Sequence, residues 1–257
     1  MSGNTTARDT KNCLYFPDHE LLYWQRNREV SPLPVHNNKR PYDFTVLNRT
    51  HKWWRATAMT DLKMSGLLDN SLWSYNTELG LECDTRTLNP IETGAIFDSH
   101  IDSFLSNGPY TCDNLSPTEH NDHSLIETHH YVDAYCNIVL ETHFDTDNSG
   151  GAFLTEKTFK PIKHGQPFVI IGCHLSLEIL RELGYKTFDH AIDNSYDLIH
   201  HPIERWMAIK NTISKIKSQD MHTWFESCRS DIEHNQRLFC SSKADRLNNL
   251  LERLHND

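Results

Sequence analysis

Long hydrophobic runs are missing from this chain. The longest apolar run covers residues 167–172, far short of the roughly 20 residues that a membrane-spanning helix needs. The N-terminal residues MSGNTTARDTKN contain no apolar region of the kind that a secretory signal requires. We therefore expect a soluble protein with no membrane span, located in the cytoplasm.

Paired cysteines and an excess of basic charge are also missing. The seven cysteines are scattered and form no CxxC pair, so they indicate neither a disulfide framework nor a thiolate zinc site. The 35 acidic residues outnumber the 25 lysines and arginines, and the formal net charge is -10. Nucleic-acid affinity depends on neutralising phosphates with lysine and arginine. We therefore expect no nucleic-acid partner, although a local basic site stays open.

Apolar residues are few, but many of them are large. They make up 37% of the 257 residues, below the roughly 45–50% of an average globular chain. The 6 Trp, 9 Tyr and 11 Phe supply bulky side chains for a core. The length is sufficient for one large domain or two small ones.

Prolines and polar clusters divide the chain. Residues 1–41 are polar and contain Pro32, Pro34 and Pro41, so we predict an irregular N-terminal segment with one short helix near residues 20–25. The remainder, residues 42–257, is predicted to form one α/β domain. Within it, residues 84–130 are rich in Asp, Asn, Ser, Thr and His and are interpreted as a loop-rich insertion.

Alternating strand and helix patterns predict the α/β class with a parallel sheet. The expected strands are residues 42–48, 137–142, 167–172 and 185–188, and the expected helices are one after residue 48, then 155–165, 176–184, 206–217, 222–234 and 244–257. Ser176 is a plausible N-cap and Gly184 a plausible residue after a helix end. Pro161 should kink or shorten its helix.

Basic residues follow the first predicted strand. Arg49, Lys52 and Arg55 recur at steps of three, so on a helix they would lie near one face. Ligands of parallel sheets bind beyond the carboxyl ends of strands, near helix N-termini. These cations, with Asn48 at the strand end, outline an anion pocket that lacks the glycines of a dinucleotide or Walker loop. The alternative is a solvated basic face.

A second polar strand end leads from Glu141 to the triplet Thr155, Glu156 and Lys157. At a helix start, the carboxylate can accept both hydroxyls of a ribose and the ammonium can contact a phosphate. The alternative is a glutamate favoured by the helix dipole beside a surface lysine.

The segment LETHFDTDNSGGAFLTEKTFKPIKHGQPFVIIG resembles the donor-binding stretch of α-1,3-fucosyltransferase-type glycosyltransferases. In that family Phe-Glu-Asn-Ser and Tyr-(Val/Ile)-Thr-Glu-Lys precede a helix and a strand. The chain also resembles exostosin-like enzymes and glycosyltransferase-like proteins of phages and large DNA viruses, through its LNR…R, TEKT.KPI, GYKTF and SYD elements. The similarity covers residues 42–76 and 131–210.

This resemblance implies a GT-B type fold with a Rossmann-like parallel sheet flanked by helices, reduced to little more than the donor-binding half. It implies that Glu156 binds the ribose and that Lys157 and Arg55 bind phosphate. Glu141 aligns with the Glu of Phe-Glu-Asn-Ser; alternatively, Asn148 and Ser149 supply the Asn-Ser pair.

The implied activity is transfer of a sugar, such as fucose or xylose, from a UDP- or GDP-sugar to an oligosaccharide or glycoprotein acceptor. The reaction is expected to invert configuration and to require no metal cofactor, although Asp145-Thr146-Asp147 has the spelling of a divalent-metal site. The alternative is a non-catalytic sugar-nucleotide or glycan-binding module, or a donor half that needs a partner chain. Candidate bases for the acceptor proton are Asp98, His100, Asp102, His143 and Asp145.

Overall fold

The computed structural model describes residues 38–78, 89–92, 96–112, 129–144 and 152–241, together with Asn248 and Glu252. The helix expected near residues 20–25 lies outside the described residues, as do most of the 84–130 insertion and nearly all of the helix expected at 244–257. No helix built from the described residues has the length and hydropathy needed to cross a membrane.

A four-stranded parallel sheet forms the centre of the protein, as the sequence predicts. Its order is β2-β1-β3-β4, and the strands are β1 Tyr42–Asn48, β2 Leu72–Tyr75, β3 Ala134–Leu140 and β4 Phe168–Ile171. Every residue of β3 is buried, which is typical of a central parallel strand that helices cover on both faces. The fold is therefore α/β and Rossmann-like.

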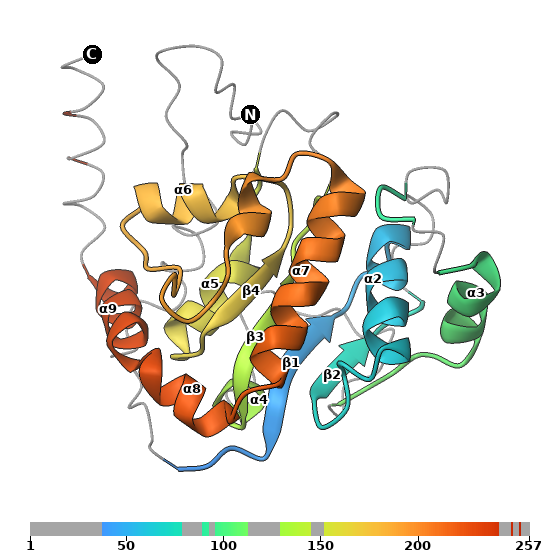
Figure 1. The fold of residues 1–257 in the computed structure, drawn as a ribbon, viewed down its shortest axis with the longest axis horizontal. Helices are drawn as coiled ribbons and strands as arrows, with labels where there is room; N and C mark the ends of the chain where they lie inside the picture. The colour runs from blue at the N-terminus through green and yellow to red at the C-terminus, as the bar shows by residue number, and fades with distance from the viewer. Residues whose placement is uncertain are drawn as a thin grey trace.

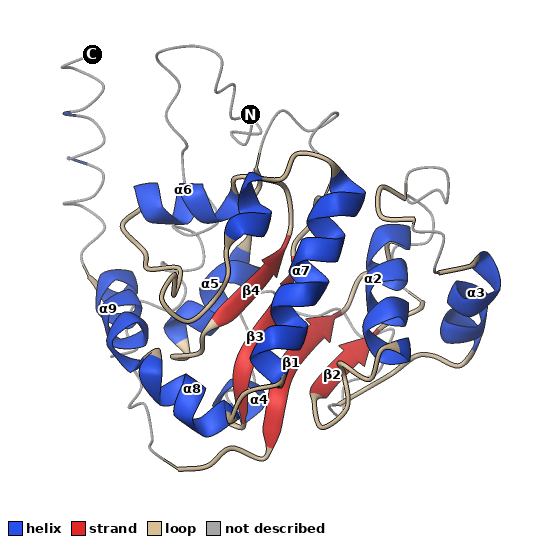
Figure 2. Ribbon diagram, in the orientation of Figure 1, coloured by secondary structure: helices blue, strands red, loops and turns tan. Residues whose placement is uncertain are grey.

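Helices flank this sheet (Figures 1 and 2). They are α2 Trp53–Met64, α3 Asp98–Ser106, α4 His129–Val132, α5 Glu156–Lys163, α6 Ser176–Glu182, the 3-10 helix η3 Ser195–Leu198, α7 Pro202–Lys217, α8 Met221–Ser227 and α9 Arg229–Cys240. Helices α2 and α7 lie side by side (Figure 1). The Trp206 indole N–H of α7 donates to Asp61 Oδ2 of α2 over 2.9 Å. The connection from β1 through α2 leads to β2 on one side of the sheet, and the connection from β3 through α5 leads to β4 on the other side. Because parallel crossovers are right-handed, α5 lies on the opposite face of the sheet from α2.

The chain changes direction between β1 and β3. From β1 it crosses through α2 to β2 on one side, whereas β3 pairs with the opposite side of β1 and leads outward to β4. In open parallel sheets the crevice outside the carboxyl ends at such a point is where ligands bind. In this chain, that point lies beyond Asn48 and Leu140.

The strand predicted at residues 185–188 is wrong. This segment is irregular because a side chain takes the place of a neighbouring strand. Lys186 N donates to Asn235 Oδ1 over 2.7 Å, and Asn235 Nδ2 donates back to Lys186 O over 2.9 Å. At the edge of β4 that has no neighbouring strand, the Tyr196 hydroxyl accepts from Ile170 N over 3.3 Å. Phe188, at φ 61°, then turns the chain away.

The predicted N-cap of α6 is also wrong by one residue. Leu175 occupies that position with φ 63°, and Ser176 is already helical. The helix start is capped from a distance, because the Asp197 carboxylate accepts from Leu177 N at 2.9 Å and from Glu178 N at 3.1 Å. Gly184 follows the helix end with φ 91°, as predicted. The SYD element thus supports β4 and α6.

Two further differences concern short elements. Strand β2 was not predicted, since four residues are too few to show an alternating pattern. The helix predicted at residues 222–234 is split at Cys228 into α8 and α9. Helix α5, by contrast, lies where it was predicted, and it ends at Lys163, two residues after Pro161.

Asp61 connects α2 to α7 through Trp206. We expect Asp61→Ala to lower the free energy of unfolding by about 1–3 kcal/mol, because the fully buried indole N–H of Trp206 loses its acceptor. Asp61 Oδ1 also accepts from Lys210 on α7. The matched control is Lys215→Ala on α7, which removes an exposed ion pair with Asp193 and should cost less than ~1 kcal/mol. Chemical denaturation measures both, and equal losses would contradict the proposed tie.

His164 is a buried imidazole at the end of α5. It is 5% exposed, and its ring stacks on Tyr131 at 4.9 Å. Within the described part of the chain, neither ring nitrogen has a hydrogen-bond partner. Burial, together with the charges of Lys163 and Lys160, lowers the pKa of His164 to about 3. Because the folded pKa is below the unfolded value, the folded state loses stability as the pH falls from about 6.5 towards 3.

We expect the free energy of unfolding to fall between pH 7 and pH 4 by about 3 kcal/mol more in the natural chain than in His164→Phe. Phenylalanine keeps a ring against Tyr131 but cannot take up a proton. Denaturant titrations at the two pH values measure the difference. Equal losses in both proteins would show that His164 does not carry this acid sensitivity.

Candidate functional site

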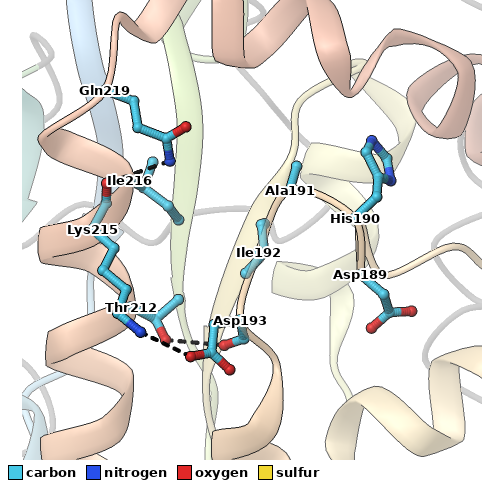
Figure 3. Close-up of a pocket in the computed structure, with 9 residues that line it drawn as sticks. All are labelled: Asp189, His190, Ala191, Ile192, Asp193, Thr212, Lys215, Ile216 and Gln219. Atoms are coloured by element: carbon cyan, nitrogen blue, oxygen red, sulfur yellow. Dashed lines mark hydrogen bonds and ion pairs between the residues drawn. The ribbon is translucent and has the colours of Figure 1, made fainter.

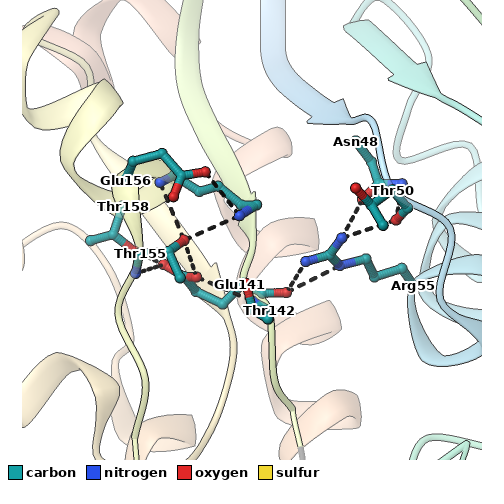
Figure 4. A network of polar contacts seen from close by, with 9 residues as sticks. Asn48, Thr50, Arg55, Glu141, Thr142, Thr155, Glu156 and Thr158 are labelled. Atoms are coloured by element: carbon teal, nitrogen blue, oxygen red, sulfur yellow. Dashed lines mark hydrogen bonds and ion pairs between the residues drawn. The ribbon is translucent and has the colours of Figure 1, made fainter. Parts of the chain in front are cut away.

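The predicted site residues converge beyond the carboxyl ends of β1 and β3 (Figure 4). Asn48 ends β1, Arg55 comes from the first turn of α2, and Glu141 directly follows β3. Thr155 and Glu156 open α5. The parallel topology brings together segments that are far apart in sequence, at the point where the chain changes direction.

Arg55 joins the ends of β1 and β3. Its Nε and Nη2 donate to the carbonyl oxygen of Glu141 at 3.1 and 2.5 Å. Its Nη1 donates to Asn48 Oδ1 at 3.1 Å and to the carbonyl of Thr50 at 3.0 Å. The side chain is only 1% exposed. The guanidinium therefore holds the strand ends in place, which differs from the direct phosphate contact that the resemblance implies.

A second buried arginine performs the same task between β3 and β4. Arg205 of α7 donates to the carbonyl of Gly172 at 3.2 Å and also to the carbonyl of Phe144. Trp54 stacks on Phe144 at 5.4 Å, and each guanidinium lies near one of these rings. The two guanidinium groups and the two rings thus pack as one layer at the carboxyl edge of the sheet.

The Glu141 carboxylate fixes the start of α5. It is fully buried and accepts four hydrogen bonds, from Thr142 N, Thr155 N, Thr155 Oγ1 and Thr158 Oγ1, at 2.6–3.2 Å. With this number of donors around it, the carboxylate is engaged within the protein (Figure 4). Glu141 is therefore a positioning residue for the Thr-Glu-Lys triplet.

Glu156 and Lys157 lie at the mouth of the site. Their side chains are 14% and 31% exposed, and Lys157 Nζ lies 3.0 Å from Glu156 Oε1. Lys157 Nζ also donates to Thr155 Oγ1 over 3.2 Å. Burial raises the pKa of Glu156, but the charge and hydrogen bond of Lys157 and the charge of Lys160 outweigh it, so the net pKa is lowered. Glu156 is thus an ionised carboxylate at neutral pH.

The expectation that Arg49, Lys52 and Arg55 share one helical face is wrong. Helix α2 begins at Trp53, so Lys52 is its extended N-cap residue and Arg49 lies in the preceding loop. The Tyr75 hydroxyl at the end of β2 shapes this loop, since it donates to Lys52 O over 3.2 Å and contacts His51 Nδ1 at 2.9 Å. Lys52 still lies beyond the carboxyl end of β1, at the start of α2.

His143 follows β3 at the same edge. Its ring meets Phe153 edge to face at 5.3 Å, and the side chain is partly exposed. Burial, with the charges of Lys52 and Arg55, lowers the pKa of His143 below its usual value, and Glu141 opposes the shift. The imidazole is therefore neutral and able to accept a proton at neutral pH.

Three of the other base candidates do not join this cluster. Asp98, His100 and Asp102 lie on α3, which packs beside α2 at the β2 edge of the sheet (Figure 1). Asp145, Asn148 and Ser149 lie outside the described residues. Within the described ranges, no group of three or more His, Cys, Asp or Glu side chains could hold a metal ion.

Two important residues were missed by sequence reasoning. Thr158 follows the Thr-Glu-Lys triplet and donates to Glu141. Its position three residues after the N-cap Thr155 could have indicated that its side chain faces the same way. Arg205 lies within an amphipathic helix, where an arginine resembles any exposed charge. Only tertiary packing identifies its role.

A pocket of about 330 Å3 lies elsewhere, between the loop at residues 189–193 and the last turns of α7 (Figure 3). Its charged groups are already paired, because Lys215 binds Asp193 at 3.0 Å and Arg181 binds Asp189 at 2.6 Å. It contains none of the predicted site residues. We therefore place the candidate site at the carboxyl edge.

Comparison with known proteins assigns no family to this chain. No family model matches it, and neither a curated protein nor a solved structure does so. The resemblance to fucosyltransferase-type enzymes therefore rests on its motifs alone, and the roles at this edge rest on the geometry described above.

We expect Glu141→Gln to lower the free energy of unfolding by about 2–3 kcal/mol, because an amide cannot accept all the hydrogen bonds that the carboxylate accepts. The matched control is Glu204→Gln on the exposed side of α7, expected within ~0.5 kcal/mol of the natural chain. Urea denaturation measures both changes. A negligible effect at Glu141 would remove its positioning role.

Proposed function

We propose that this protein is a glycosyltransferase that binds a nucleoside diphosphate sugar at the carboxyl edge of its sheet. One observation carries the proposal: Lys52 follows the carboxyl end of β1, His143 follows that of β3, and Glu156 and Lys157 open α5 at the same edge, where Glu141 holds the start of that helix. This edge is where open parallel sheets bind nucleotides. The motif resemblance leads to the same class of enzyme independently of the geometry.

The donor diphosphate suits the cationic side of this crevice. Lys52 at the start of α2 and Lys157 at the start of α5 supply ammonium groups. Arg55 adds buried positive charge behind them. The ion pair between Glu156 and Lys157 keeps both groups ordered, and a ligand can exchange that pair for a ribose on the carboxylate and a phosphate on the ammonium.

Transfer requires that negative charge on the departing nucleoside diphosphate be stabilised. Fixed cations at the crevice meet this requirement electrostatically, so the proposed reaction needs no metal cofactor. UDP- and GDP-sugars, including those of fucose and xylose, remain the donor candidates. The proposed acceptor is an oligosaccharide or glycoprotein hydroxyl.

A second function is favoured by the single sheet. The described residues form one four-stranded sheet, whereas a GT-B enzyme of the resembling family uses two Rossmann-like halves. This favours a donor half that works with a partner chain, or a sugar-nucleotide or glycan-binding module. Slow release of nucleoside diphosphate from a UDP- or GDP-sugar distinguishes the candidates, because a binding module should release none.

We expect Lys157→Ala to weaken nucleoside diphosphate binding by roughly 1.5–3 kcal/mol, because it removes a charged hydrogen bond to phosphate. Isothermal calorimetry with UDP, GDP and their sugars measures the affinity. Lys215→Ala, on the far part of α7 beside an exposed carboxylate, is the matched control and should leave it unchanged. Absence of binding by every nucleotide would overturn the proposed function, and unchanged affinity in Lys157→Ala would reject that residue's role.

A further inference from the structure

His143 is placed and oriented by the same layer that closes the site. It lies two residues beyond Glu141, whose carboxylate and carbonyl are both held. The next residue, Phe144, is buried against Trp54. Phe153 contacts the imidazole from the side at 5.3 Å. The backbone on either side is therefore anchored while the ring itself stays partly exposed at the mouth.

The charged groups near His143 come from the two neighbouring strand ends. Arg55, on the β1 side, donates to the carbonyl of Glu141, two residues before His143, and Lys52 is the N-cap residue of the same helix α2. Burial and these two cations disfavour the imidazolium, and the Glu141 carboxylate favours it. His143 is thus a neutral but weak base.

We infer that His143 is the catalytic base and that the donor's diphosphate activates it by offsetting the charges of Lys52 and Arg55. This inference rests on the proposed function. It singles out one of five sequence candidates, because among those on described residues His143 alone follows the carboxyl end of a central strand, whereas the others lie on α3.

The proposed step balances without an added reactant. A neutral nitrogen of His143 takes the proton of the acceptor hydroxyl, and the hydroxyl oxygen forms a bond to the anomeric carbon. The bond from that carbon to the β-phosphate oxygen breaks, and its electron pair leaves with the nucleoside diphosphate. The imidazolium later returns the proton to solvent.

Coupling follows from electrostatics. A bound diphosphate places negative charge beside Lys52, so protonated His143 is no longer surrounded by an excess of positive charge. The pKa of His143 should therefore rise when nucleotide binds. A base is most effective when its pKa lies near the working pH, so the site would be activated only after the donor arrives.

The first test is an NMR pH titration of the natural chain with all histidine rings assigned through their backbone correlations. Spectra are recorded without ligand, with UDP and with GDP. We expect the pKa of His143 to start below 6.5 and rise with the nucleotide that binds. His190, which contacts Ser227 on α8, serves as the internal control and should not move. Bound nucleotide with an unmoved His143 would overturn the inference.

The second test uses His143→Gln, with His190→Gln as the matched control. We expect His143→Gln to lower kcat for donor turnover by roughly 10²–10⁴-fold while the nucleotide Kd stays within about twofold. Retained turnover in His143→Gln would overturn the inference and leave the proposed function standing. If no nucleotide binds the natural chain, the proposed function and the inference both fall, so the two failures are distinguishable.

Discussion

Two buried arginines hold the carboxyl edge of this protein together. Arg55 connects the ends of β1 and β3, and Arg205 connects the ends of β3 and β4, in each case through backbone carbonyl oxygens. Carbonyls at strand ends have no partner within the sheet, and burying them without donors is costly. A guanidinium, with several donors in one plane, can satisfy carbonyls from two strands at once. The loops beyond these ends depend on that arrangement.

Arg55 and Glu141 are buried and bond to other parts of the protein, so they support the site but do not face solvent. The groups that are partly exposed at the site are Glu156 and Lys157. Glu141 holds Thr155 and Thr158, which sets the direction of α5. Glu156 and Lys157 are then presented at the mouth. Burial, together with the positive charge behind this edge, keeps His143 neutral. Arg55 and Glu141 therefore both support the fold and set the electrostatic environment of His143.

The sheet was largely predictable because its strands are apolar runs between breakers and its helices repeat every three or four residues. Strand β3 and helix α5 lie close to where the sequence places them. Residues 185–188 failed because β-branched and aromatic content indicates an extended chain but not its partner. Asn235, from a distant helix, supplies those hydrogen bonds instead. Strand β2 failed because it is too short for any periodic signal.

The sequence by itself determined the α/β class, the two polar strand ends and the types of residue that gather there, because periodicity and composition are local properties. Tertiary structure alone decided which of those residues are available. Arg55 and Glu141 look like ligand-binding groups in sequence, yet packing buries them and directs their polar atoms to the backbone. Arg205 looks like a surface charge, yet it closes the edge. Such roles depend on burial and on partners far away along the chain, and no local pattern records either.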